Sequence, residues 1–200
     1  MKTFLCILLG YLIGSINWGL VIGLMFYHKD IRDYGSGNAG GTNAGRVLGK
    51  PIGILVILLD ALKALLVMII VNKICPGNEQ YAGLAVCIGH CFPVFAHFKG
   101  GKAVASSYGY LLGLAIYVTH DFLWTFICPV LTFFIVLGVS KMVSLSSMCG
   151  LLSSAITVSI FDNLETGILL LLLSIFVIYR HKANIERIKN GTESKISLFK

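Results

Sequence analysis

Seven apolar runs separated by short polar stretches constrain this chain more than any other feature. They lie at about 4–26, 52–72, 81–97, 104–119, 122–139, 147–161 and 165–179. A helix needs about 20 residues to cross roughly 30 Å of hydrocarbon, so the third, fourth and sixth runs are short. We therefore predict an all-α integral membrane protein, a single domain over residues 1–200 that forms a bundle of seven transmembrane helices. Five or six spans remain an alternative if short runs are re-entrant.

The composition agrees with a membrane protein. The chain is 56% hydrophobic and 12% charged, whereas a soluble domain carries roughly 25% charged residues. Its first run resembles a signal peptide, but it continues to about Phe26 and no Ala-x-Ala-like site follows. We therefore predict a first transmembrane helix that is retained.

The basic residues predict an orientation. Thirteen of the sixteen Lys and Arg residues fall in alternate loops and in the C-terminal tail, whereas Lys2 and Lys73 lie on the other side and Lys63 within a run. Loops rich in Lys and Arg stay in the cytoplasm. The pattern predicts the N-terminus outside and the C-terminus in the cytoplasm. It also accounts for the net charge of +7 without nucleic acid as a partner.

Three polar islands would then face the cytoplasm, and the first spans 32–46. It contains Gly35-Ser36-Gly37-Asn38 and Gly40-Gly41-Thr42-Asn43, with Arg46 before a helix that starts at Pro51. Amides, hydroxyls and a guanidinium predict an anion-binding loop, with a flexible linker as the alternative. Gly-x-Gly-x-x-Gly also occurs here, but no strand precedes it, which excludes a dinucleotide fold.

The second island, 92–105, places Lys99 and Lys102 around Gly100 and Gly101. It is not a Walker loop, because the first glycine and the final Ser or Thr of that motif are missing. Glycines permit close backbone approach to a ligand, and a helix starting near Lys102 would point its amides at an anion. Two lysines that only snorkel to the interface are the alternative.

The third island, 180–195, combines basic residues with His181 and Asn184, and we predict that its helix runs on to Gly191. A hydroxyl-rich loop at 141–147 contributes Ser144. Within the second apolar run, Asp60 and Lys63 lie three residues apart on one helix face. The spacing leaves open whether they form a structural ion pair or line the site. The six cysteines show no metal-binding spacing, so no metal is predicted.

Taken together, the islands make the chain resemble one family, the bacterial acyl-phosphate-dependent glycerol-3-phosphate acyltransferases (PlsY family). The matching segments are 35–43 with Arg46, 89–105 and 181–193, in the family's order and spacing. The chain departs from the family where Asn17 replaces a usual proline, Gly41 an alanine, Ala103 a glycine and Ser106 a threonine. We expect Gly41 to loosen the first loop and Ala103 to stiffen the second.

The resemblance implies a polytopic acyltransferase of the bacterial cytoplasmic membrane, with its active site facing the cytoplasm. Acyl phosphate and glycerol 3-phosphate would give 1-acyl-glycerol 3-phosphate and phosphate, the first step of phospholipid synthesis, without a cofactor. Membrane lipids and the enzyme that makes acyl phosphate are the further partners implied. A small phosphate or organophosphate transporter is the main alternative, and a lipid-binding scaffold is a third. Transporters typically contain internal repeats, and none is visible in this sequence.

The site prediction combines the resemblance with the need of two anionic substrates for cations and fixed donors. His181 is either the general base or a residue that orients substrate, with a phosphate oxygen of the donor then accepting the proton; both possibilities stay open. The predicted catalytic residues are His181, Asn184, Ser36, Arg46 and Lys102. The predicted substrate-binding residues are Gly37, Asn38, Thr42, Asn43, His90, Lys99, Gly100, Gly101 and Ser144. The predicted structural residues are Glu193, which would pair with a basic residue of the tail, Asp60 and Lys63.

Overall fold

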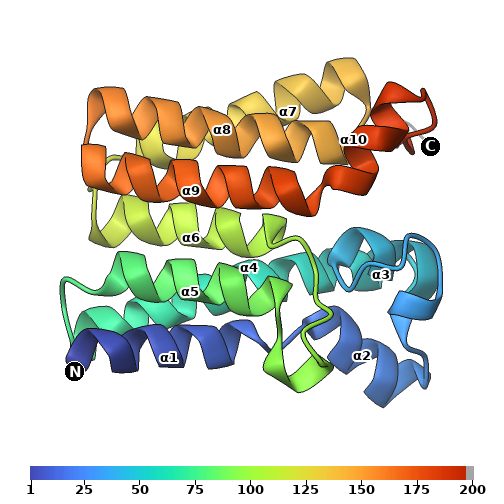
Figure 1. Cartoon of the computed structure of the whole chain (residues 1–200), viewed down its shortest axis with the longest axis horizontal. Coiled ribbons are helices and arrows are strands. Elements are labelled where there is room, and N and C mark those ends of the chain that lie inside the picture. The colour runs from blue at the N-terminus through green and yellow to red at the C-terminus, as the bar shows by residue number, and fades with distance from the viewer. Residues whose placement is uncertain (197–200) are drawn as a thin grey trace. The chain divides into compact units, whose positions relative to one another are not determined.

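The computed structural model describes residues 1–196, and every regular element in that part of the chain is a helix (Figure 1). The residues group into two compact units, Met1–Val118 and Thr119–Lys200. Four segments are long and apolar enough to cross a membrane: Lys2–Tyr27, Lys50–Ile74, Leu123–Ser140 and Val143–Phe161. A bent pair, Leu164–Arg180 with Lys182–Lys189, would be a fifth span. All seven predicted runs contain helix, but several helices are too short to meet this criterion.

The first unit contains the close-packed helices α1 (Lys2–Gly14), α4 (Lys50–Ile74), α5 (Glu79–Cys91) and α6 (Val104–Tyr117). Glycines allow α1 and α5 to approach closely. A Cβ on Gly14 would collide with the backbone of Val86, and one on Gly89 would collide with the backbone of Tyr11. Small residues at helix contacts are the usual means of tight packing in membranes.

The first predicted span is broken rather than continuous. Helix α1 ends at Gly14 and α2 (Trp18–Tyr27) begins after Asn17, which has an extended backbone. Asn17 is buried, and its side-chain amide donates to the carbonyl of His90 at 3.4 Å. Serine and asparagine favour such breaks because their side chains compete for backbone hydrogen bonds.

The first polar island contains a helix that the sequence did not predict. Residues expected in an open loop form the first turns of α3 (Gly41–Leu48), preceded by the short η1 (Ile31–Asp33). Gly41 therefore does not loosen a loop as expected. It is buried against α4, where an added Cβ would lie 2.5 Å from Cγ1 of Ile57 and 2.8 Å from the carbonyl oxygen of Gly53.

The third predicted run is also shorter than expected, because α5 ends at Cys91 and Pro93 follows shortly. Thirteen residues span only about 20 Å, well short of the bilayer core. The single turn η2 (Val94–Ala96) then leads into the second polar island. Ala103, just before α6, has the left-handed conformation (φ 58°). This conformation is unfavourable for alanine, whereas glycine adopts it without a steric penalty.

The second unit contains η3 (Leu123–Ile127), α7 (Cys128–Ser140), α8 (Val143–Phe161), α9 (Leu164–Arg180) and α10 (Lys182–Lys189). The sixth run starts at Val143 rather than 147, and the hydroxyls of Ser146 and Ser147 donate to the carbonyls of Met142 and Val143, one turn back. The tail helix continues towards Gly191 (φ 68°) as predicted, but it bends by 62° between α9 and α10.

Candidate active site

Asn43 is the centre of the first polar island. Its side-chain N–H groups donate to the carbonyls of Ile31 (2.7 Å), Asn38 (2.9 Å) and Tyr34 (3.1 Å), and its oxygen accepts from the amide of Ser36 (2.8 Å). The residue is buried. Asn43, predicted to bind substrate, therefore has its side chain engaged with the loop that it shapes.

The other predicted residues of this island take different positions. Thr42 and Arg46 lie one turn apart on the exposed side of α3, and Ser36 is exposed in the preceding loop. Asn38 is half-buried and accepts from the amide of Gly40 at 2.9 Å. Gly37 has a φ of 68°, which glycine alone adopts without strain. The side chains of Ser36, Thr42 and Arg46 are thus presented outward on a fixed backbone.

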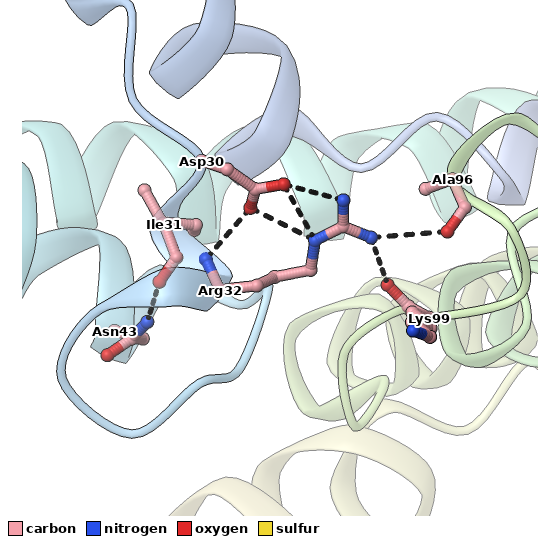
Figure 2. Close-up of polar contacts among 6 residues, drawn as sticks. All are labelled: Asp30, Ile31, Arg32, Asn43, Ala96 and Lys99. Carbon is pink, nitrogen blue, oxygen red and sulfur yellow. Dashed lines mark hydrogen bonds and ion pairs between the residues drawn. The ribbon is translucent and has the colours of Figure 1, made fainter.

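Arg32, which the site prediction did not include, forms hydrogen bonds that connect the first polar island to the second (Figure 2). Its guanidinium pairs with Asp30 at 2.6 Å and donates to the carbonyls of Ala96 and Lys99, both at 3.1 Å. Hydrogen bonds from Arg32 hold the pKa of Asp30 below its usual value and outweigh the opposing effect of burial. The carbonyl partners are more than 60 residues away in sequence, so no local motif could have revealed this link.

In the second island, the glycines pack against protein rather than exposing their amides. The N–H of Gly100 donates to the carbonyl of Cys91 at 3.2 Å, and that of Gly101 to the carbonyl of His90 at 3.0 Å. A side chain on Gly101 would collide with the His90 ring. The sequence predicted that a ligand would approach these glycines closely, but the end of α5 packs against them instead. Lys99 is exposed and Lys102 is half-buried beside these glycines.

Asp60 and Lys63 form a buried ion pair, with 2.8 Å between Oδ1 and Nζ. Lys63 also contacts Nδ1 of His90 at 3.0 Å. His90, predicted to bind substrate, is itself buried within this network.

The second unit holds a separate polar cluster around Glu193. Oε1 accepts from the hydroxyl of Ser144 and the amide of Asn184, both at 2.6 Å, and Oε2 accepts from Nε of Arg187 at 2.7 Å. Burial alone would raise the pKa of Glu193, but these hydrogen bonds outweigh it, so the pKa lies below the usual value. Glu193 pairs with a basic residue of the tail, the contact that the sequence predicted.

His181 lies at the bend between α9 and α10 and is buried. Its Nδ1 is 2.8 Å from the carbonyl oxygen of Val177. A carbonyl only accepts, so Nδ1 carries the proton and the lone pair of the neutral ring is on Nε2. The backbone thus fixes the tautomer of the predicted catalytic histidine.

The helices define an integral membrane protein whose regular elements over residues 1–196 are all helical, with cationic and hydrogen-bonding groups in its polar islands. Comparison with known proteins identifies the family. The sequence model of the glycerol-3-phosphate acyltransferase family matches residues 4–191, and the chain belongs to this family.

Two curated relatives have the same name, "Glycerol-3-phosphate acyltransferase". The protein of Macrococcus caseolyticus is 41% identical, with all of both chains covered. That of Geobacillus kaustophilus is 44% identical, covering 97% of this chain and 96% of the relative.

Two crystal structures share the fold. Both are of PlsY (YgiH), described as an integral membrane glycerol 3-phosphate acyltransferase. The glycerol 3-phosphate form has a TM-score of 0.88 and the lysophosphatidic acid form 0.82. Each is 30% identical and covers 98% of this chain and 96% of its own.

Proposed function

We propose that this protein transfers an acyl group from acyl phosphate to the sn-1 hydroxyl of glycerol 3-phosphate, giving 1-acyl-glycerol 3-phosphate and inorganic phosphate. The observation that carries the proposal is the full-length similarity to a structure described as the glycerol 3-phosphate form of an acyltransferase. The second structure is described as the lysophosphatidic acid form, and lysophosphatidic acid is the product of such a transfer.

The transfer forms one bond and breaks another. The glycerol hydroxyl oxygen attacks the acyl carbonyl carbon, and the bond from that carbon to the phosphate oxygen breaks. The hydroxyl proton goes either to Nε2 of His181 or to a phosphate oxygen of the donor. The tautomer imposed by Val177 supports the first route, because it places the lone pair on Nε2.

The first unit supplies cations for the two phosphates. Arg46 and Lys99 are exposed and Lys102 is half-buried, and Ser36 and Thr42 add exposed hydroxyls. Charged donors make stronger hydrogen bonds to phosphate than neutral donors do. In this proposal Asn43, Gly100 and Gly101 fix the backbone that carries these groups.

The second unit supplies Asn184 as a donor to the oxygen of the attacked carbonyl. One N–H of its amide is held by Glu193, which orients the group before reaction. Ser144 donates its own proton to Glu193, so its role is to orient that carboxylate. The two units are proposed to act as one acyltransferase domain, since the family match spans both.

We further propose seven membrane crossings in a bacterial cytoplasmic membrane, with the N-terminus outside and the three polar islands at the cytoplasmic face. The distribution of Lys and Arg supports this orientation. A single cysteine in place of His120 should then react with an impermeant maleimide added outside intact cells. A cysteine in place of Lys195 should react only after the membrane is opened. The enzyme that makes acyl phosphate is proposed as a partner.

The direct test supplies purified protein with an acyl phosphate and labelled glycerol 3-phosphate. We expect labelled lysophosphatidate and phosphate in equal amounts. His181→Gln should lose most of the rate, whereas the exposed His120→Gln should retain it. A residual rate of His181→Gln with unchanged pH dependence would exclude histidine as the base.

The transporter alternative predicts a different result, in which labelled glycerol 3-phosphate crosses a vesicle membrane and no lysophosphatidate forms. Membership of the acyltransferase family does not favour it.

A further inference from the structure

A buried charged network lies beside the break in the first span. The side chains of Lys63 and Asp60 are only 4% and 1% exposed, and His90 is equally buried. An ammonium within a membrane-spanning helix is costly unless its partners satisfy it. The contacts of Lys63 therefore indicate what the network does.

Each N–H of the Lys63 ammonium has an acceptor. Nζ lies 3.0 Å from the carbonyl oxygen of Gly14, 2.7 Å from that of Ile16 and 3.0 Å from Nδ1 of His90. Asp60, at 2.8 Å, balances the charge as an ion pair. The two carbonyls lie where α1 ends, and helix ends leave such groups without an intrahelical partner. Lys63 thus joins the break in the first span to His90.

His90 passes this link on to the second polar island. Because Nδ1 accepts from Lys63, the neutral ring carries its proton on Nε2, on the side that faces Gly101. The carbonyl of His90 accepts from the amide of Gly101 and from the side chain of Asn17. The carbonyl of His90 therefore binds the amide of Gly101, and its ring packs against the same glycine, next to Lys102.

The other end of the same segment is held by Arg32, through the carbonyls of Ala96 and Lys99. The four residues 99–102 are consequently anchored at both ends. One anchor comes from the first polar island. The other comes from a charged residue inside the membrane span.

We propose that Lys63 and His90 are positioning residues that set the place of the segment 99–102, and with it the cation of Lys102, for the phosphate of glycerol 3-phosphate. The kinetic part of this proposal rests on the proposed function, whereas the structural part does not.

The kinetic test compares Lys63→Met with Lys63→Arg. Lys63→Met removes the donors, so the KM for glycerol 3-phosphate should rise about 10-fold or more, while kcat stays within about 3-fold; tenfold corresponds to about 1.4 kcal/mol. Lys63→Arg keeps charge and donors and should recover much of the loss. Lys73→Met, at the exposed end of the same helix, is the matched control.

A second arm needs no activity. Hydrogen exchange should be faster over 99–103 in Lys63→Met than in the wild type or in Lys73→Met. If Lys63→Met fails to fold because it leaves Asp60 unpaired, Asp60→Leu/Lys63→Met removes both charges and serves in both arms. If the wild-type protein shows no acyl transfer, the proposed function is refuted. Hydrogen exchange over 99–103 would still decide whether Lys63 positions the segment.

A double-mutant cycle tests the route through the ring. Gly101→Ala introduces a side chain against the His90 ring, and His90→Asn makes room while keeping an acceptor for Lys63. We expect the KM of the double variant to rise by less than the product of the increases in the two single variants. Independent effects, or folded Lys63 variants with unchanged KM and unchanged exchange over 99–103, would overturn the proposal.

Discussion

Asn43 and Glu193 organise the polar segments of the two units with opposite chemistry. Asn43 is a neutral amide that mainly donates, and its three acceptors are backbone carbonyls. Glu193 is a carboxylate that accepts, and its three donors are side chains. A centre that binds carbonyls fixes the course of the backbone, whereas one that binds side chains fixes functional groups.

The comparison also separates two kinds of sensitivity. The Asn43 contacts involve no titrating group and depend on one amide keeping its donors. The Glu193 contacts depend on ionisation and are therefore linked to pH. The changes below test this difference, from the largest expected effect to the smallest.

Asn43→Asp should have the largest effect. The carboxylate has the same shape but cannot donate, so the carbonyls of Ile31, Tyr34 and Asn38 lose their partner and face a negative charge. Each buried polar group left unsatisfied costs roughly 1–3 kcal/mol, so we expect a loss of about 3 kcal/mol or more. Thermal unfolding in detergent measures this.

The control for that change lies in the same loop. Asn38 uses only its side-chain oxygen, as an acceptor for Gly40, in the contact seen here, so Asn38→Asp keeps the bond and should cost under about 1 kcal/mol. Equal losses for the two variants would show that Asn43 is not the centre of the loop.

Glu193→Gln should affect activity more than stability. The amide oxygen can still accept from Ser144 and Asn184, but the amide nitrogen cannot accept from Arg187. Arg187 is 39% exposed, so after solvent screening the lost pair is worth about 1 kcal/mol. We expect kcat to fall on the order of 10-fold, because the side chain at 193 is no longer held by Arg187 and therefore orients Asn184 less firmly.

Glu186→Gln, an exposed change on α10, should leave kcat unaltered. If Glu193→Gln destabilises the protein as much as Asn43→Asp but retains full kcat, the two centres do not differ as proposed.

Acid should loosen the tail selectively. The pKa of Glu193 is lowered in the folded protein from the ordinary value of 4.5. Its stabilising contribution is therefore fully present above about pH 4.5 and is lost as the pH falls through the folded pKa. Hydrogen exchange over 182–193, corrected for the intrinsic rate, should rise in that range. Glu193→Gln should show no such rise.

Ala103→Gly should have the smallest effect. Relief of the left-handed conformation contributes about 1 kcal/mol, and the greater freedom of glycine in the unfolded chain offsets much of it. The unfolding temperature should rise slightly or stay unchanged. A marked fall would show that the buried methyl group of Ala103 contributes more than the strain costs.

Much of the fold followed from the sequence. Each apolar run contains helix, and the start near Pro51 and the stop at Gly191 were recognisable from local residue chemistry. Helix α3 was missed because glycine, threonine and asparagine are typical of loops. What stabilises this helix is packing on α4, which local propensity does not report.

The candidate site was recognisable by residue type but not by the arrangement of its contacts. Lys102, His181 and Asn184 were predicted from their chemistry and the family motifs. The link through Arg32 and the contact of Lys63 with His90 join segments 27 to 67 residues apart, and spacing along the chain carries no signal of them. The contacts of Asn43 with the loop backbone likewise gave no signal in the sequence, from which Asn43 was predicted as a substrate-binding residue.

Gly41 illustrates how this packing limits sequence change. The family resemblance implies alanine at this position, but one methyl group would require α3 to move away from Ile57 and from the backbone at Gly53. A smaller side chain at 57 would relieve the contact with Cγ1 of Ile57, whereas the contact with the backbone oxygen of Gly53 would remain. Substitution at 41 is therefore epistatic to position 57, and its cost also depends on how far α3 can shift away from α4.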